Sequence, residues 1–527
     1  MTPPPSSCDV LVVGSGNAGF SAAISAAQSG ATRVLLIDKC PESWAGGNSY
    51  FTAGAYRVAH DGLASILPLV SNVTPEQAQR IDLAPYTTTD FARDMHTVCG
   101  GRSDKHLSRV LVHESGDAVR WLARNGVRFW LSFNRQAYEV DGRIKFWGGL
   151  CLRTPDGGKS LIQDLRHAAA RQGVTTCFST ALTGLRHQGS RVVATVSCDG
   201  QARDITAGAV VLAAGGFEAS PSLRSQFLGP GWDMAYVRGT PHNTGDALQL
   251  AVQTLGAQPY GNWSGCHSVA WDASTAVDPD AGDREASNEY TKSGYPLGLM
   301  LNAEGRRFVD EGVDLRNYTY AKFGRAILAQ PGHVAFQVWD ARTSAMLRAE
   351  EYRPERAEHI TGATIEELAA ACAEKGLLDR EAFVRTVAEY NDAVYAHRGE
   401  NPGAKFDPSV RDGLSTQSEG KRLALAKSNW ALPLDQGPFL AVKVTCGVTF
   451  TFGGVKIDTE TAQLLSAATG RGIPGVYCCG EMVGGLFYGN YPGGSGLTSG
   501  TVFGRRAGRA AAEAAARTAT ERESSKL

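Results

Sequence analysis

The feature that most constrains the fold is a glycine pattern directly after an apolar run near the N-terminus. Residues 9–13 read Asp-Val-Leu-Val-Val, and Gly14, Gly16 and Gly19 follow. This spacing predicts a buried strand, a tight turn and the start of a helix, as in dinucleotide-binding units. Gly14 permits the turn, Gly16 lets a pyrophosphate approach the backbone, and Gly19 lets the helix pack against the strand.

The next segment completes this unit. A helix is expected over residues 21–29, ending at Gly30, and an apolar strand over residues 33–37 ends at Asp38. Asp38 lies about 20 residues past the glycines, where a carboxylate can bind ribose hydroxyls. The alternative is a glycine turn in another strand–helix–strand unit, but the second strand and the acid favour nucleotide binding.

Length and composition exclude several classes of function. The 527 residues predict two or more folding units, and a net charge of −1 gives no electrostatic basis for binding nucleic acid. No apolar run reaches the roughly 18 residues needed to span a bilayer, so no membrane span is expected. The eleven cysteines lack metal-ligand spacing with histidines, so we expect reduced thiols and no metal site.

The two ends of the sequence bear on localisation. Residues 1–7 are proline-rich and uncharged, unlike a secretory signal. Residues 525–527 read Ser-Lys-Leu, which matches a peroxisomal address, although three residues also match by chance. We expect a C-terminal targeting tail at 521–527 and a peroxisomal protein, or otherwise a cytoplasmic one.

Small and polar residues at several turns are candidates for holding an extended cofactor. A glycine- and serine-rich loop follows Asp38, and a buried strand ends at Ala214 and Gly215. Asp246 can hold a cofactor hydroxyl or cap a helix, and both interpretations stay open. A glycine-rich turn before a terminal helix at 498–516 can direct a positive dipole end at a cofactor ring. The predicted cofactor-binding residues are Gly14, Gly16, Asn17, Ala18, Gly19, Asp38, Lys39, Gly46, Gly47, Asn48, Ser49, Gly54, Ala214, Gly215, Asp246, Glu481, Ser495 and Leu497.

The pattern of predicted strands and loops changes twice along the chain. From about residue 261 it becomes loop-rich and mixed, and near residue 445 strands followed by glycine turns return. We therefore predict an α/β fold: a Rossmann-like domain split into residues 1–260 and 445–520, with an α+β domain inserted at 261–444.

Several short motifs together resemble one family. They are residues 45–49, 213–216, 244–247, 302–308 and 452–454 and Gly480-Glu481. Over most of its length the chain resembles the fumarate reductase/succinate dehydrogenase flavoprotein family. Residues 47–55, 310–322 and 490–496 resemble most the branch of tricarballylate dehydrogenase and the precorrin-3B synthase flavoprotein. The resemblance implies FAD in the split domain, with the inserted domain capping the substrate. It also implies non-covalent FAD, because the loop that carries covalent flavin in succinate dehydrogenases has no histidine here.

The resemblance also suggests catalytic residues. Fumarate reductases protonate substrate carbon with a capping-domain arginine, and Arg316 stands near that position. Their early substrate-binding histidine corresponds to His267. A second histidine is replaced by the sequence Thr449-Phe450-Thr451, and the arginine that clamps a carboxylate is replaced by Tyr491. Fumarate and succinate are therefore unexpected substrates.

Each candidate also has a purely structural interpretation. Arg316 can bind a carboxylate, shuttle a proton, or form a salt bridge with Asp314 or Glu311. The other candidate donors, His267, Tyr318 and Tyr491, can equally be buried packing residues.

The sequence thus predicts an FAD-dependent oxidoreductase acting on a C–C bond. We expect dehydrogenation of a tricarballylate-like polycarboxylate by proton abstraction and hydride transfer to flavin. One alternative is a 3-ketosteroid-dehydrogenase-like desaturase or ene-reductase acting on an apolar carbonyl compound of secondary metabolism. Another is a flavin-binding protein without catalysis. The electron partner stays open among oxygen, a quinone-linked partner and reduced nicotinamide or flavin.

Overall fold

The cofactor-side half of the molecule is built around the predicted N-terminal unit. The computed structural model describes residues 3–275 and 278–524. Strand β1 (Ser7–Val13) leads into α1 (Asn17–Gln28) and then β2 (Val34–Ile37), which pairs parallel with β1. Apart from Ser7 and Asp9, the residues of β1 and β2 are buried, as expected for strands inside a parallel sheet.

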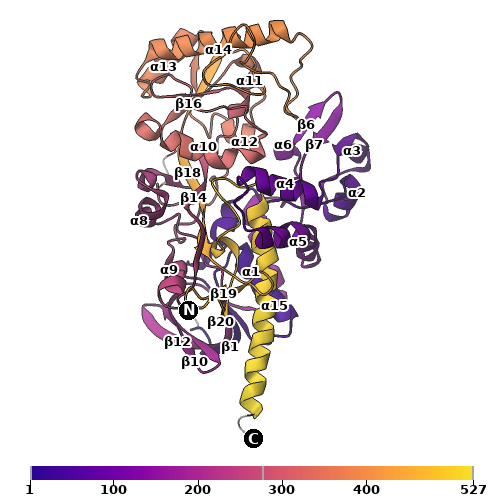
Figure 1. Cartoon of the computed structure of the whole chain (residues 1–527), viewed down its shortest axis with the longest axis vertical. Coiled ribbons are helices and arrows are strands. Elements are labelled where there is room, and N and C mark those ends of the chain that lie inside the picture. Colours follow the sequence, from indigo (N-terminus) through magenta and orange to yellow (C-terminus); the bar gives the residue numbers. More distant parts are fainter. Residues whose placement is uncertain (1–2, 276–277, 525–527) are drawn as a thin grey trace.

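This sheet has the order β10-β11-β12-β1-β2-β9, with β20 added beside β12 and β19 beside β20. Its other strands are β9 (Thr175–Cys177), β10 (Thr180–Gln188), β11 (Arg191–Cys198), β12 (Gln201–Leu212), β19 (Gln463–Leu465) and β20 (Gly472–Cys478). Because β20 pairs parallel with β12, the last part of the chain returns to the sheet begun by the first. The terminal helix α15 (Ser495–Ser524) packs along α1 and projects beyond the body (Figure 1).

A second sheet connects the two halves of the molecule. Its strands are β13 (Tyr236–Val237), β14 (Pro259–Asp272), β15 (Leu299–Asn302), β16 (Ala335–Trp339), β17 (Ile360–Gly362) and β18 (Phe439–Val455). Strands β14 and β18 pair antiparallel along most of their length and run from the cofactor-side half into the capping half (Figure 1). The predicted boundaries at 260/261 and 444/445 fall inside these two strands.

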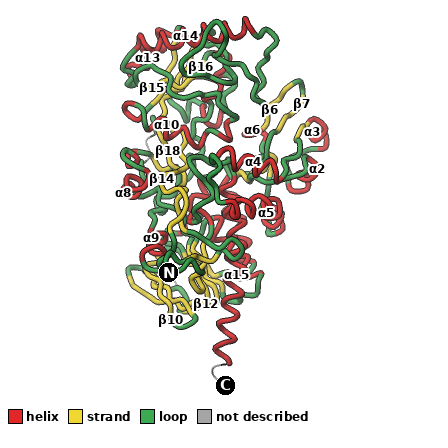
Figure 2. Tube along the Cα trace, viewed as in Figure 1, coloured by secondary structure: helices red, strands yellow, loops and turns green. Residues whose placement is uncertain are grey.

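Helices cover the sheets on their outer sides, as Figure 2 shows for the capping half. The capping half carries α10 (Tyr320–Leu328), α11 (Ala341–Ser344), α12 (Ala349–Tyr352), α13 (Ile365–Glu374) and α14 (Arg380–Glu400). A lateral lobe carries α2 (Leu63–Ile66), α3 (Pro75–Arg80), α4 (Thr88–Val98), α5 (Lys105–Arg124) and α6 (Phe133–Gln136). Its short strands are β3 (Ala55–Tyr56), β4 (Ile81–Leu83), β5 (Trp130–Leu131), β6 (Ala137–Val140), β7 (Arg143–Phe146) and β8 (Leu152–Arg153). The remaining helices on the cofactor side are α7 (Gly157–Arg171), α8 (Pro221–Leu223) and α9 (Asp246–Gln253).

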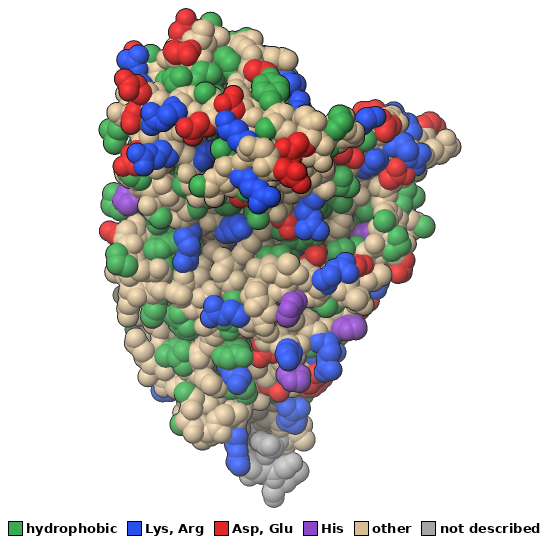
Figure 3. Space-filling view, turned by 45° about the horizontal axis from the view of Figure 1, so that its top comes forward, with side chains coloured by type: hydrophobic (Ala, Val, Ile, Leu, Met, Phe, Trp, Pro, Cys, Tyr) green, Lys and Arg blue, Asp and Glu red, His purple; other side chains and the backbone are tan. Residues whose placement is uncertain are grey.

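The α/β prediction is confirmed, and the terminal helix is longer than expected at both ends. All eleven cysteines are free thiols. Basic and acidic side chains are interspersed over the face shown in Figure 3. Within the described part of the chain, no helix combines the length and apolarity that a bilayer crossing needs. Residues 525–527 lie outside the described residues, so peroxisomal targeting stays a prediction.

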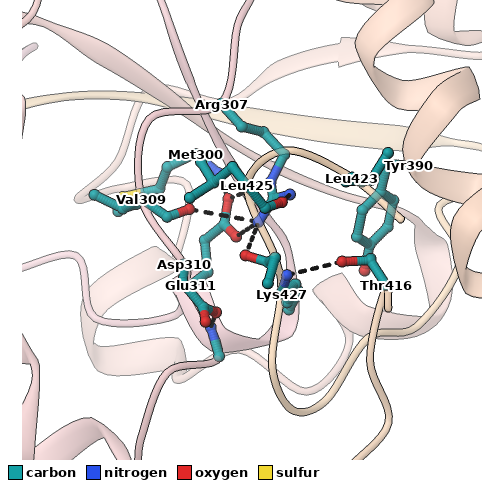
Figure 4. Close-up of polar contacts among 12 residues, drawn as sticks. Met300, Arg307, Val309, Asp310, Glu311, Tyr390, Thr416, Leu423, Leu425 and Lys427 are labelled. Atoms are coloured by element: carbon teal, nitrogen blue, oxygen red, sulfur yellow. Dashed lines mark hydrogen bonds and ion pairs between the residues drawn. The ribbon is translucent and has the colours of Figure 1, made fainter. Parts of the chain in front are cut away.

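A buried polar cluster stabilises the capping half (Figure 4). Arg307 pairs with Glu311 at 2.5 Å, and both side chains are almost fully buried. Glu311 also accepts from the backbone N–H of Met300, while Arg307 donates to the carbonyl of Leu425. Nearby, the Lys427 ammonium donates to the carbonyl of Gly298 at 2.7 Å, and burial lowers its pKa to about 8. These bonds fasten the segment before Arg316 to the irregular segment before β18.

Replacing Glu311 should therefore destabilise the capping half. Glu311→Ala leaves the buried Arg307 guanidinium without its counter-ion, which costs about 3 kcal/mol or more in the free energy of unfolding. Urea unfolding followed by tryptophan fluorescence measures this loss. Glu139→Ala, which removes the exposed pair with Arg80, is the matched control and should change little. Equal effects of the two substitutions would contradict the prediction.

Candidate active site

One cavity extends from the glycine turn after β1 to the capping half. Predicted cofactor residues line one end of it, and residues of β14, β18 and the cap line the other. The predicted cofactor residues that line it are Gly14, Gly16, Asn17, Ala18, Asp38, Lys39, Gly47, Asn48, Ser49, Ala214, Gly215, Asp246, Glu481 and Leu497. Residues from seven separate stretches of sequence thus meet around one elongated space.

The fingerprint glycines are required for distinct geometric reasons. Gly14 has φ +110°, and a Cβ there would lie 2.3 Å from the carbonyl oxygen of Ala213. A Cβ on Gly19 would lie 1.8 Å from the carbonyl oxygen of Gly14, so α1 packs directly on the turn. At Gly16 a Cβ would meet only ordinary contacts of 3.6 Å or more and would occupy cavity space. Gly16 therefore leaves room for a ligand, whereas Gly14 and Gly19 permit the fold itself.

Four predicted cofactor residues shape the walls instead of lining the cavity. Gly19 packs on Gly14, and Gly54 packs against Thr154 and Gly157. Gly46, at φ +110°, packs against Ile162, and the hydroxyl of Ser495 donates to the carbonyl of Pro492. Direct cofactor contact is not indicated for these four.

The acidic residues of the cofactor end have defined partners. Asp38 accepts two hydrogen bonds of 2.7 Å from the backbone N–H and the hydroxyl of Ser15, so it lies against the glycine turn as predicted for a ribose-binding acid. Asp246 is the first residue of α9 and pairs with Lys39. The N-cap of α9 is therefore Gly245 and not Asp246, while Asp246 lines the cavity and its binding of a cofactor hydroxyl stays a prediction.

At the capping end, two tyrosine hydroxyls form a pair. The hydroxyl oxygens of Tyr320 and Tyr491 are 2.6 Å apart, and both rings line the cavity. Burial raises the pKa of Tyr320, and burial together with Tyr320 raises that of Tyr491 well above its ordinary value. Both hydroxyls are therefore protonated at neutral pH, and after one bonds to the other, one O–H remains to donate.

His267 lies against this pair. Its ring centroid is 5.0 Å from each tyrosine ring, and its side chain is 98 % buried. Neither ring nitrogen of this buried histidine has a hydrogen-bond partner among the described residues. Burial and the neighbouring charge of Arg238 lower its pKa well below the ordinary value, so the ring is neutral. A neutral imidazole with both nitrogens unsatisfied is suited to a ligand in the cavity.

Two guanidinium groups also line this end. Arg316 donates to the Ser293 hydroxyl at 3.3 Å, and that hydroxyl donates to the Glu351 carboxylate. Since Glu311 is occupied by Arg307, the predicted alternative pairing of Arg316 with Glu311 is not what the structure shows. Arg238 follows β13 and donates to the side-chain oxygen of Asn288 at 2.6 Å.

Tyr318, the fourth predicted catalytic residue, is absent from the described lining of this cavity. Its hydroxyl donates to Asp94 at 2.6 Å, in a buried cluster with Arg57 and Tyr86. Residues 316–318 form a single helical turn directly before α10, so Tyr318 and Tyr320 belong to different elements. Tyr320, which the sequence analysis did not single out, lines the cavity, and a catalytic role of Tyr318 stays a prediction.

The same segment is fastened to the last glycine turn. Asn490 donates its side-chain amide to the carbonyl of Tyr318 at 2.6 Å, and the N–H of Gly493 donates to the carbonyl of Asn317. Arg57 donates to the carbonyl of Gly493 at 2.9 Å from the other side. These bonds between distant parts of the chain set the spacing between Tyr320 and Tyr491.

Several lining residues were missed in the sequence. Tyr320 stands inside a motif quoted for the family resemblance, Phe450 stands where the sequence departs from that family, and Phe487 lies just before the last quoted motif. Arg238 directly precedes the small residues Gly239 and Thr240, which are only a weak indication that a neighbouring side chain lines a cavity. No group of three or more potential metal ligands occurs among the described residues.

The cofactor end fits a dinucleotide. The N-cap of α1 is Gly16, and the N–H of Asn17 donates to the Ser49 hydroxyl at 3.0 Å, so the N–H groups that follow in the first turn can donate to a phosphate. Asp38, at the adjacent strand end, supplies an acceptor for ribose, and Gly16 leaves space for the pyrophosphate. This geometry defines a flavoprotein-type nucleotide site beneath a capping domain.

Comparison with known proteins identifies the family. Residues 9–497 match the FAD binding domain family, and the chain belongs to it. A fumarate reductase (cytochrome) of Shewanella frigidimarina is 28 % identical over 503 residues, covering 94 % of this chain and 75 % of that protein. A 4-oxocyclohexanecarboxylate 2-dehydrogenase of Sinomonas cyclohexanicum is 28 % identical over 558 residues, covering 94 % and 91 %.

Among solved structures, the open conformation of a flavocytochrome c3 fumarate reductase has a TM-score of 0.69 and 26 % identity, covering 97 % of this chain and 79 % of that one. The predicted family, fold and FAD cofactor are thereby confirmed. The chain is an FAD-dependent oxidoreductase that acts on a carbon–carbon bond.

The glycine geometry leads to a prediction for cofactor binding. Gly16→Ala should leave the fold intact but weaken FAD binding at least tenfold, because the new methyl group occupies cavity space. Flavin fluorescence in a filtration assay measures the release. Gly399→Ala, at an open position, is the matched control and should retain FAD. Full retention of FAD by Gly16→Ala would contradict the assignment.

Proposed function

We propose that this enzyme interconverts a saturated and an unsaturated C–C bond adjacent to a carbonyl group, in a substrate with an apolar body and one carboxylate. The observation that carries the proposal is the protonated Tyr320–Tyr491 pair beside the neutral, unsatisfied His267 in the cavity. Neutral donors of this kind suit a carbonyl oxygen that becomes an enolate.

The tyrosine pair supports the chemistry next to a carbonyl. When a proton leaves the carbon beside a carbonyl, negative charge accumulates on the oxygen. An O–H donor in a buried site stabilises that charge more than water does. Of the two hydroxyls, the one that accepts from the other is the stronger donor, because hydrogen bonds in a chain polarise one another. Bound FAD supplies the acceptance or donation of the hydride.

The other residues that line the capping end support the apolar body and the carboxylate of the proposed substrate. Phe450, Phe452 and Phe487 line the capping end and pack edge-on or tilted against Tyr491, which suits an apolar body. Arg238 and Arg316 line the same end and can bind a carboxylate. The 4-oxocyclohexanecarboxylate dehydrogenase relative is named for a substrate with both groups, which supports this combination.

The tricarballylate-like substrate expected from the sequence is the weaker candidate. Three carboxylates on a short chain favour charged partners, whereas the capping end is dominated by aromatic rings and neutral donors. We retain tricarballylate as a probe because Arg238 and Arg316 can bind carboxylates.

The tyrosine pair is tested by removing single hydroxyls. Tyr491→Phe and Tyr320→Phe should each lower kcat about 100-fold or more, because one donor to the developing enolate is lost or depolarised. Stopped-flow flavin reduction measures the effect, and an unchanged flavin spectrum shows that the site is intact. Tyr395→Phe on the exposed surface of α14 is the matched control. Activity within twofold of the parent enzyme in both cavity variants would remove the pair from the mechanism.

The substrate class is tested by anaerobic flavin absorbance with 4-oxocyclohexanecarboxylate, cyclohexanone and tricarballylate. We expect the keto acid to bleach the flavin at lower concentration than the ketone, because only the keto acid has a carboxylate. Arg238→Gln should reduce the ratio between the ketone and keto-acid concentrations needed for bleaching by about tenfold or more. Bleaching by tricarballylate alone would replace the proposal with polycarboxylate desaturation. If the reduced enzyme is instead reoxidised by an unsaturated keto acid, the enzyme works as a reductase.

A further inference from the structure

The carboxyl group of Glu218 lies behind the cofactor end of the cavity, and the proposed reaction does not use it. Glu218 follows the Gly215-Gly216-Phe217 turn after β12, and its side chain is fully buried. Its Oε1 accepts from the side-chain amides of Asn48 and Asn243, the latter at 2.6 Å. Glu218 thus joins the loop that carries Asn48 to the loop before α9.

Glu481 meets Glu218 above Gly216. A Cβ placed on Gly216 would lie 2.1 Å from Oε1 of Glu481 and 2.8 Å from Oε2 of Glu218, so only glycine leaves room for both carboxyls. Oε1 of Glu481 accepts from the backbone N–H of Thr451 at 2.7 Å and from its hydroxyl at 3.1 Å. Glu481 also faces the cavity, whereas Glu218 is enclosed by protein.

The two carboxyls require a proton between them. Oε2 of Glu218 is buried and receives no hydrogen bond from any N–H or O–H donor of the described residues. The other ionisable groups recorded around it are Arg224, which donates to the backbone carbonyl of Glu218, and the buried thiol of Cys266. Two adjacent buried carboxylates repel each other strongly, and a shared proton converts the repulsion into a hydrogen bond. Burial and the neighbouring Glu481 accordingly raise the pKa of Glu218 well above its ordinary value.

We propose that Glu218 and Glu481 share one proton and that Glu218 is a positioning residue for the cofactor site. The protonated Glu218 donates to Glu481 and holds its carboxylate at the cavity wall. Through its other oxygen, Glu218 holds Asn48 and Asn243 in place. The loop at Asn48, the turn after β12 and the Glu481 turn are then joined by one buried network beside the FAD site.

The proposal predicts how FAD affinity depends on pH. Below the raised pKa of the pair the proton is present and affinity is highest. As pH rises through that pKa, two buried anions face each other, the network opens, and FAD is released. Because one proton is linked to binding, the dissociation constant should rise by up to about tenfold per pH unit above that pKa.

The experiment measures FAD release from the holoenzyme by filtration and flavin fluorescence between about pH 6 and about pH 10, a range well above the ordinary glutamate pKa. Glu218→Gln should retain FAD with a flat pH profile, because its amide donates to Glu481 without titrating and its oxygen still accepts from both asparagines. Glu218→Ala should weaken binding at least tenfold at every pH. Glu374→Gln, an exposed residue on α13, should behave like the parent enzyme.

A second measurement, on the parent enzyme alone, tests the shared proton even if a variant fails to fold. The infrared spectrum of the parent holoenzyme at neutral pH should contain the C=O stretch of a buried protonated carboxyl, which disappears at alkaline pH. A flat pH profile of FAD affinity in the parent enzyme, or the absence of that band, would overturn the shared proton. If Glu218→Gln binds FAD as weakly as Glu218→Ala, donation by Glu218 is excluded.

Discussion

Backbone pairing between β14 and β18 is the interaction on which the rest of the structure depends. The two strands belong to both halves of the molecule, and the site lies where they pass from one half to the other. His267 pairs in register with Phe450 in this region, and Cys266 pairs with Thr451. Arg238 joins them because its N–H donates to the carbonyl of Val448 in β18. This ladder, with register shifts between Asn262 and Cys266 and between His267 and Ser268, fixes the substrate-side groups relative to the cofactor sheet.

The site combines two electrostatic environments. Toward the nucleotide end, polar and charged groups such as Asp38 and Lys39 already have partners that hold them against the cavity. Toward the capping end, burial keeps Tyr320, Tyr491 and His267 in their neutral forms. A chain that binds an anionic cofactor and handles a developing enolate needs both environments, because a neutral donor stabilises that charge without first needing a counter-ion of its own.

A structural feature could be predicted from the sequence when it depends on residues that are close together in the chain. The glycine turn, the helix after it and β2 were predicted correctly because each depends on residues within one strand–helix–strand unit, whereas ribose binding by Asp38 stays a prediction. Tyr320 was not singled out, because no local pattern shows which residues of a helical segment face a cavity formed by distant strands. The partners of Arg316 could not be read from the sequence either, since Glu311 is held by Arg307 and Ser293 lies on a separate loop.

The sequence by itself determined the nucleotide-binding unit, the split α/β organisation and the flavoprotein family, because these follow from local periodicity and from glycines at fixed spacing. Only the tertiary structure decided which tyrosines meet and where Arg238 lies. It also decided that Glu218 and Glu481 converge over Gly216. Those features arise from contacts between segments hundreds of residues apart, whose distances depend on strand register and on glycines that leave space for neighbouring side chains.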